Sequence, residues 1–140
     1  MRETGRPGLR LGTWEVRLDW EANIGYWTPA SSRAERRAII DIGLTPVLRL
    51  APGERGRFFV EAGIGAHLLS DTSPYRGREL GSAFQFGDLI GIGWRLGDRN
   101  GYEVALRIEH FSNAGIKHPN QGIEFAMLRL VRWLSAGPLA

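Results

Sequence analysis

The sequence predicts an all-β fold, an antiparallel up-and-down β-barrel. Nineteen of the 140 residues are glycine, and no long segment shows the 3.6-residue period of an amphipathic helix. Several long segments instead alternate apolar and polar residues. A chain of this length forms one domain with room for a small barrel. We therefore expect a short N-terminal lead over residues 1–13, one β-barrel domain over 14–134 and a tail over 135–140.

The first predicted strand, Trp14–Tyr26, has the clearest pattern. Every even position is apolar, and most odd positions carry charged or polar side chains. Its length is about twice that of a common strand, and is sufficient for a tilted strand to cross a bilayer. Five further segments continue the even-numbered apolar face, giving six strands in all: 37–50, 57–70, 82–96, 101–112 and 122–134. Asp88 interrupts that face, and we expect a bulge near Gly87 to re-aim its side chain.

The connections between these strands alternate strictly between short and long. Residues 51–56 and 97–100 are short connections, whereas 28–36, 71–81 and 113–121 are longer. In an antiparallel barrel this places all turns at one end and all long loops at the other, as in outer-membrane barrels. Aromatic residues then fall near both ends as two girdles: Trp14, Phe58, Trp94, Tyr102 and Trp133 at the turn end, and Tyr26, Trp27, Phe84 and Phe86 at the loop end.

Alternation alone also fits a soluble barrel, whose core would be the even face. Strand length, loop asymmetry and the glycines on the odd face favour the membrane version, because a narrow interior must fit opposing side chains.

No run of about 18 apolar residues indicates a membrane helix, and the first residues lack the apolar region of a signal peptide. The absence of cysteine excludes disulfides and cysteine-ligated zinc.

Other common site types find little support. The net charge is +3, but the aromatic residues are not interleaved with basic ones, so we expect no nucleic-acid partner. Fragments such as Gly63-Ile64-Gly65 lie inside strands and precede no helix, which excludes a dinucleotide fingerprint. His67 and His118 have no neighbours at metal-ligand spacing. We expect neither a cofactor nor a metal.

A possible catalytic group lies in the last predicted hairpin. His110 and Ser112 face the same side of a strand, with Cα atoms roughly 6.6 Å apart. If the hairpin is symmetric about Lys117, Glu124 lies opposite His110. A carboxylate there would orient an imidazole that takes the serine proton. Most such trios are ordinary solvated residues, so the spacing alone does not establish catalysis. Glu109 and Phe111 face the other way, toward the interior.

The surrounding motif resembles the lipid A 3-O-deacylases, acyloxyacyl hydrolase-like barrels of Gram-negative outer membranes. The resemblance rests on the segment His110-Phe111-Ser112-Asn113-Ala114-Gly115-Ile116-Lys117, on Pro119-Asn120 and Gly122-Ile123-Glu124, and on the upstream segments 61–65 and 84–93. It covers roughly residues 14–133. It implies a carboxylic ester hydrolase in the bacterial outer membrane that removes the 3-O-linked acyl chain of lipid A, the membrane anchor of lipopolysaccharide.

The resemblance also implies roles for individual residues. Ser112 would be the nucleophile, His110 the general base and Glu124 the acid that orients it. Asn113 would donate to the oxyanion, with the Gly115 amide as a weaker second donor. The family's barrel has eight strands, so the first two are expected to be missing from this chain, leaving 14–27 and 122–134 as sheet edges.

Basic residues in the long connections form a weaker prediction. Arg76, Arg78 and Lys117 would lie at the loop end, where the phosphates of lipid A are found, although solvated loop charge explains them equally well. Two other functions stay open: a non-catalytic outer-membrane barrel and a soluble ligand-binding barrel. Whether the protein forms a homodimer is also open.

Overall fold

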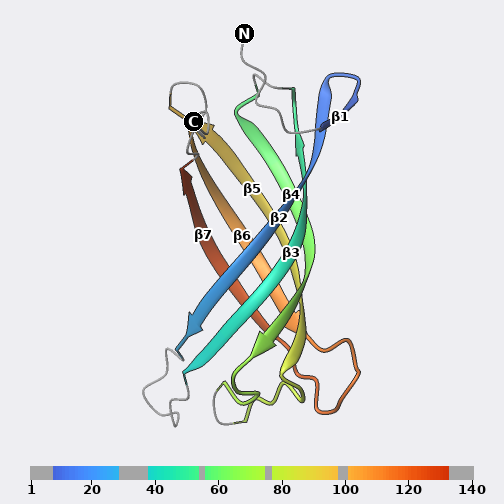
Figure 1. The fold of residues 1–140 in the computed structure, drawn as a ribbon, viewed down its shortest axis with the longest axis vertical. Coiled ribbons are helices and arrows are strands. Elements are labelled where there is room, and N and C mark those ends of the chain that lie inside the picture. The colour runs from blue at the N-terminus through green and yellow to red at the C-terminus, as the bar shows by residue number, and fades with distance from the viewer. Residues whose placement is uncertain (1–7, 29–37, 54–55, 75–76, 98–100, 133–140) are drawn as a thin grey trace, which may run out of the picture.

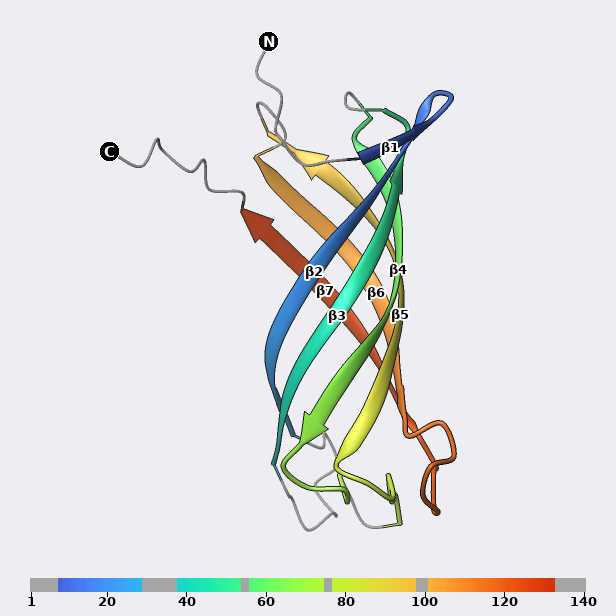
Figure 2. The ribbon, with the colours of Figure 1, turned by 45° about the vertical axis from the view of Figure 1, so that its right-hand side comes forward.

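The computed structural model describes residues 8–28, 38–53, 56–74, 77–97 and 101–132. These residues form one antiparallel seven-stranded sheet in which each strand pairs with the next along the chain. The sheet is strongly curved about its long axis (Figure 1, Figure 2). Its strands are β1 (Gly8–Leu11), β2 (Trp14–Trp27), β3 (Ile39–Ala51), β4 (Phe58–Leu69), β5 (Phe84–Leu96), β6 (Tyr102–Ser112) and β7 (Ile123–Arg132).

The six expected strands are present with small shifts at their ends, but the strand count is corrected to seven. The additional strand, β1, lies inside the predicted lead and pairs Gly8 to Leu11 with Arg17 to Trp14. Gly12, with φ +63°, makes the tight turn between β1 and β2. Four residues are too few for an alternating pattern to stand out in the sequence, which is why β1 was missed.

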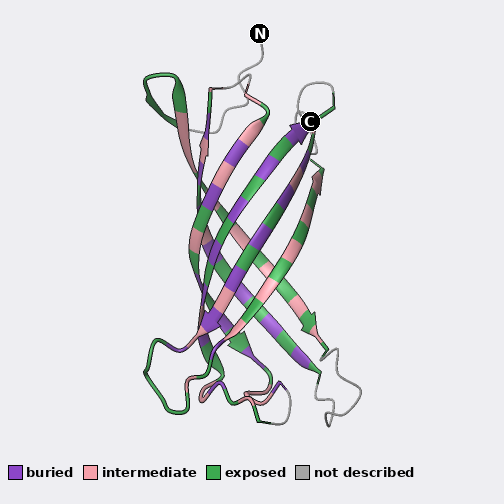
Figure 3. Ribbon diagram, turned by 180° about the vertical axis from the view of Figure 1, so that it is seen from behind, coloured by how far each residue is buried: buried purple, intermediate pink, exposed green. Residues whose placement is uncertain are grey.

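The two faces of the sheet have opposite character. Apolar even-numbered side chains are exposed on the outer face, such as Ile24 at 82% and Leu130 at 74%, whereas Arg49 and Glu61 on the inner face are only 1% and 2% exposed. Figure 3 shows the resulting alternation of buried and exposed residues along the strands. A soluble barrel would bury the apolar face, so that alternative is wrong. The outer face instead has the composition of a surface that contacts lipid.

The charged side chains on the inner face form ion pairs with one another. Arg49 contacts Glu61 at 2.9 Å and Glu103 at 3.1 Å, and Arg107 contacts Glu61 at 2.6 Å. Arg107 also contacts Glu21 of β2 at 2.7 Å. Because each buried charge has an opposite charge within reach, the inner face can be enclosed without leaving these ions unpaired.

The predicted bulge near Gly87 is not formed. The pairing of β5 with both neighbours continues in constant register through Gly87 and Asp88, and Asp88 stays exposed on the outer face. A Cβ at Gly87 would lie 2.7 Å from both His67 Nε2 and Glu109 Oε1. The glycine therefore makes room for two inward-facing side chains. Glu109 and Phe111 are buried on the inner face, as predicted.

The expected edges of the sheet are found in part, because β7 is an outer strand but β1, not β2, is the other. Within the described residues, β7 pairs only with β6, and β2 is covered by β1 over only four residues. Side chains nevertheless link β7 with β2, because Arg129 of β7 contacts Glu21 of β2 at 2.9 Å. The described part of the chain contains no helix long and apolar enough to cross a membrane.

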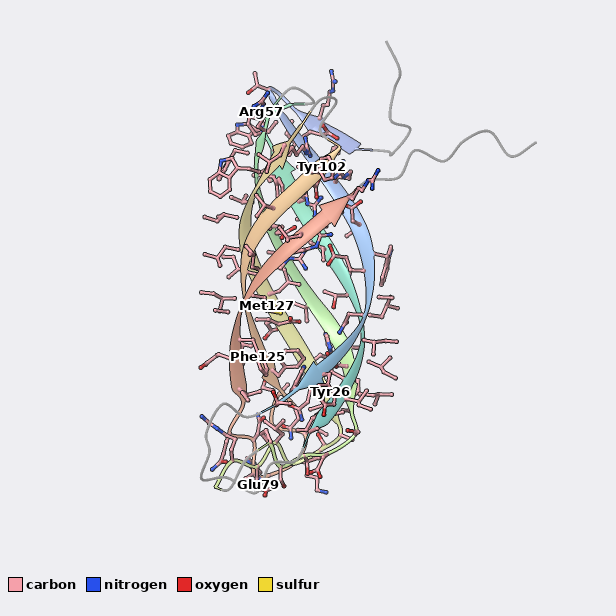
Figure 4. All side chains as sticks on the ribbon, turned by 90° about the vertical axis from the view of Figure 1, so that its left-hand side faces the viewer. Tyr26, Arg57, Glu79, Tyr102, Phe125 and Met127 are labelled. Carbon is pink, nitrogen blue, oxygen red and sulfur yellow. The ribbon has the colours of Figure 1, made fainter. Side chains whose placement is uncertain are left out.

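Turns and long connections separate as predicted. The β1–β2 turn lies at one end of the sheet, and the connections that follow β4 and β6 lie at the other (Figure 1). Figure 4 places Arg57 and Tyr102 at the turn end and Tyr26 and Glu79 at the loop end. One girdle assignment is corrected: Trp27 packs inward against Phe111, at a ring distance of 4.8 Å. Trp133 lies outside the described residues.

Candidate active site

The end of β6 and the start of β7 bring His110 and Glu124 together. They are paired residues in the register of the two strands, as hairpin symmetry predicted. His110 Nδ1 lies 3.3 Å from Glu124 Oε1, with the side chains 42% and 73% exposed. Ser112, the last residue of β6, is half-buried on the same face as His110, between the buried residues Phe111 and Asn113. All three residues therefore belong to the outer face.

The imidazole of His110 lies against the backbone of Gly122. A Cβ placed on Gly122 would come within 2.8 Å of His110 Cε1 and 3.3 Å of Nε2. Since Nδ1 faces Glu124, Nε2 is the ring nitrogen left for a hydroxyl. Among the described residues no hydrogen bond joins it to Ser112, a common situation in active sites without substrate.

The side chain of Asn113 is fully buried and organises the loop after Ser112. Its Nδ2 donates to Leu80 O at 3.0 Å and to Lys117 O at 2.7 Å. Its Oδ1 accepts from the Gly115 N–H at 3.0 Å. The N–H groups of both predicted oxyanion donors are thus engaged within the protein. Ala114 between them has φ +52°, an uncommon conformation for a residue with a side chain.

The three basic residues predicted at the loop end have different surroundings. Arg78 donates from Nη1 to Gln121 O at 2.9 Å, so it braces the loop that leads into β7. Lys117 is exposed. Arg76 lies outside the described residues.

A second carboxylate is near the trio. Asp88 of β5 is the register partner of His110 on the side opposite Glu124, and it is exposed on the outer face. No ion pair or hydrogen bond connects Asp88 to His110 within the described part of the chain. The described residues also contain no group of three His, Asp or Glu side chains arranged to hold a metal ion.

Residues 3–132 match the family model described as lipid A 3-O-deacylase (PagL). The chain belongs to the PagL family. It is 44% identical over 119 residues to the lipid A deacylase PagL of Bordetella bronchiseptica, covering 84% of this chain and 63% of that protein. It is 37% identical over 106 residues to the lipid A deacylase PagL of Pseudomonas aeruginosa, covering 75% and 58% respectively. The chain thus spans less than two thirds of the length of either relative.

The fold agrees with this membership. A crystal structure of the outer membrane enzyme PagL superposes with a TM-score of 0.74 at 31% identity, covering 89% of this chain and 80% of that one. The resemblance identified from the motif around His110 and Ser112 is therefore confirmed as a PagL-family relationship.

The sequence analysis did not identify the loop residues whose hydrogen bonds hold the PagL-family motif in place. Leu80 and Gln121 belong to two different loops, and each contacts the other loop through hydrogen bonds. Loop residues have no periodicity from which such contacts could be predicted. Gly122 could have been noticed, because a glycine at the first position of a predicted strand often marks a special backbone conformation.

Proposed function

We propose that this chain is an outer-membrane esterase that removes the 3-O-linked acyl chain of lipid A, with Ser112, His110 and Glu124 as its catalytic residues. The observation that carries the proposal is the contact of 3.3 Å between His110 Nδ1 and Glu124 Oε1 on the same face as Ser112. PagL-family membership supplies the substrate class.

The proposed reaction begins with attack of Ser112 Oγ on the ester carbonyl. His110 Nε2 takes the hydroxyl proton, and Glu124 stabilises the resulting imidazolium through Nδ1. Collapse of the tetrahedral intermediate breaks the bond to the sugar oxygen, which receives the proton from His110. Water then attacks the acyl-serine with His110 again acting as base, and the fatty acid is released.

The developing oxyanion needs hydrogen-bond donors. Asn113 and Gly115 can serve only if substrate binding replaces one of their present bonds. The Nδ2 bond of Asn113 to Lys117 O is part-buried, whereas the bond to Leu80 O is buried. We therefore propose that an oxyanion accepting a hydrogen bond from Asn113 Nδ2 would displace Lys117 O.

The outer-face position of the trio supports an approach of the ester through the membrane. Ile108 and Leu106 precede His110 on the same face and are 57% and 54% exposed. On β7, Leu128 on the face of Glu124 is 68% exposed. Acyl chains lying along these residues would bring an ester at the lipid headgroup level directly to Ser112. We propose that the barrel is of the eight-stranded type, with its long loops facing outward.

The phosphates of lipid A would lie beside these loops. Lys117 is exposed and would contact one directly, and Arg78 and Arg76 remain proposed ligands. Arg78 would keep its hydrogen bond to Gln121 O while its guanidinium contacts a phosphate.

Mass spectrometry of lipid A tests the function. The chain is refolded in detergent micelles and incubated with purified lipid A that carries a 3-O-linked acyl chain. We expect loss of that one chain and no loss with Ser112→Ala. Equal loss with Ser112→Ala would refute the serine mechanism, and no loss with either protein would support the non-catalytic barrel.

A further inference from the structure

Gly122 has two properties that point to a role beyond a turn. It adopts φ +62°, and it is buried directly beneath the imidazole of His110. At 2.8 Å from Cε1, a Cβ at this position would be closer than real Cβ atoms come to other heavy atoms. Any side chain would therefore push the imidazole away by roughly half an ångström to regain ordinary van der Waals contact.

The peptide that precedes Gly122 is fixed by the neighbouring loop. Arg78 donates to Gln121 O at 2.9 Å, and Gln121 Oε1 accepts from the Glu79 N–H at 2.7 Å. The Gln121 N–H donates to Glu79 O at 3.3 Å. Three hydrogen bonds between Gln121 and the residues Arg78 and Glu79 thus determine where Gln121, and with it Gly122, lies.

Glu124 alone would hold the imidazole weakly. The pair is largely exposed, and one contact of 3.3 Å at Nδ1 only weakly opposes rotation of the ring about the Cβ–Cγ bond. Contact with the Gly122 backbone restricts this rotation on one side. The edge of the ring that carries Cε1 and Nε2 faces Gly122, and Ser112 follows His110 by two residues on the same face.

We propose that Gly122 is a positioning residue for the catalytic base, and that the contacts of Gln121 with Arg78 and Glu79 hold it in place. The inference rests on the proposed function, since it assumes that His110 activates Ser112. It assigns the loop between β4 and β5 a part in catalysis, although that loop contributes none of the three catalytic residues.

The test compares Gly122→Ala, Gly122→Asn and Gly12→Ala, each refolded in detergent micelles. Gly12 is a matched control, because its φ of +63° is nearly that of Gly122 and no atom lies within 4 Å of an added Cβ. Asparagine tolerates positive φ better than alanine but still adds a Cβ, so it separates steric displacement from backbone strain. The measurements are kcat and KM for lipid A and the rate at which an alkyl fluorophosphonate labels Ser112.

We expect Gly122→Ala and Gly122→Asn to lower kcat by about 10-fold to 100-fold, as misplacement of a catalytic group by less than 1 Å implies, with KM within twofold. Labelling of Ser112 should slow in proportion, because it needs the same base but no lipid A. Gly12→Ala should behave as the unaltered chain. Wild-type kcat in Gly122→Ala, or recovery of kcat in Gly122→Asn, would overturn the proposal.

Gln121→Ala provides a second variant if the Gly122 variants do not fold. It removes the side-chain acceptor for Glu79 but leaves Gly122 intact, so we expect a several-fold loss in kcat with KM unchanged. An unchanged kcat would count against the proposal. If the unaltered chain leaves lipid A intact yet labels at Ser112, the proposed substrate fails, and the labelling rates alone decide the role of Gly122.

Discussion

Replacing Glu124 by Gln tests how much the carboxylate contributes to the proposed reaction. The amide oxygen can still accept a hydrogen bond from His110 Nδ1, so the substitution removes the charge and keeps the contact. The two side chains are 42% and 73% exposed and 3.3 Å apart. Exposed ion pairs of this kind contribute about 1 kcal/mol or less, and an effective dielectric near 20 would raise the interaction to about 4 kcal/mol.

The surroundings decide which value applies during catalysis. When acyl chains of the substrate cover the outer face, water is displaced from one side of the pair, while the loop side stays hydrated. An intermediate value of about 1.4 to 3 kcal/mol corresponds to a loss of roughly 10-fold to 100-fold in kcat. Ser112→Ala and His110→Ala remove groups that take part in bond making, so their loss should reach several orders of magnitude.

The assay is kcat for release of the fatty acid from lipid A in detergent micelles, with Asp88→Asn as comparison. Asp88 is also a register partner of His110, but among the described residues it makes no ion pair with it. We expect Asp88→Asn to change kcat by less than about threefold. The reasoning is refuted if Glu124→Gln falls as far as Ser112→Ala, or if Asp88→Asn loses as much as Glu124→Gln.

Three further predictions concern the loop and the inner face. Asn113→Ala should destabilise the loop as well as slow catalysis, measured as faster proteolysis of residues 113–121, because its amide holds both Leu80 O and Lys117 O; unchanged proteolysis would contradict this. Glu61→Ala should lower the free energy of unfolding, measured in urea, by about 3 kcal/mol. This is the lower end of the range for a broken buried ion pair, because Arg49 and Arg107 keep other partners. An unchanged urea midpoint would refute the prediction. Lys117→Ala should raise KM for lipid A several-fold with kcat unchanged, and no effect on KM would exclude it as a phosphate ligand.

The strands were predictable because the alternation of apolar and polar residues indicates both where a strand lies and which of its side chains point outward. The even-numbered rule placed His110 and Ser112 on the outer face, and hairpin symmetry about Lys117 gave the pairing of His110 with Glu124. The same rule places Trp27 on the inner face, and its assignment to an outer girdle followed only from its position near the strand end. The position of a residue along a strand predicts how near it lies to the end of the barrel, whereas its even or odd number predicts the face to which its side chain points. A residue belongs to an outer girdle only if it lies near the end and points outward.

The loop contacts could not be predicted, because they join residues far apart in the chain. Nothing in the sequence near Gln121 indicates that its side chain accepts from Glu79, and nothing near Leu80 indicates that its carbonyl receives Asn113. The family motif identified Asn113 as important, but its burial and its three hydrogen bonds became visible only in the folded chain.

The position of the trio along β6 also follows from physical constraints. A carboxylate on a lipid-facing surface is costly at the bilayer midplane and much less so near the interface. His110 lies two residues before the end of β6 and Glu124 one residue after the start of β7. Moving the pair two residues toward the middle would place it at Ile108 and Ala126, the next outward register pair, among exposed aliphatic side chains. There the carboxylate would lose hydration and the ester linkages of a lipid would be out of reach, so the proposed catalysis and membrane solvation both favour the same end of the strand.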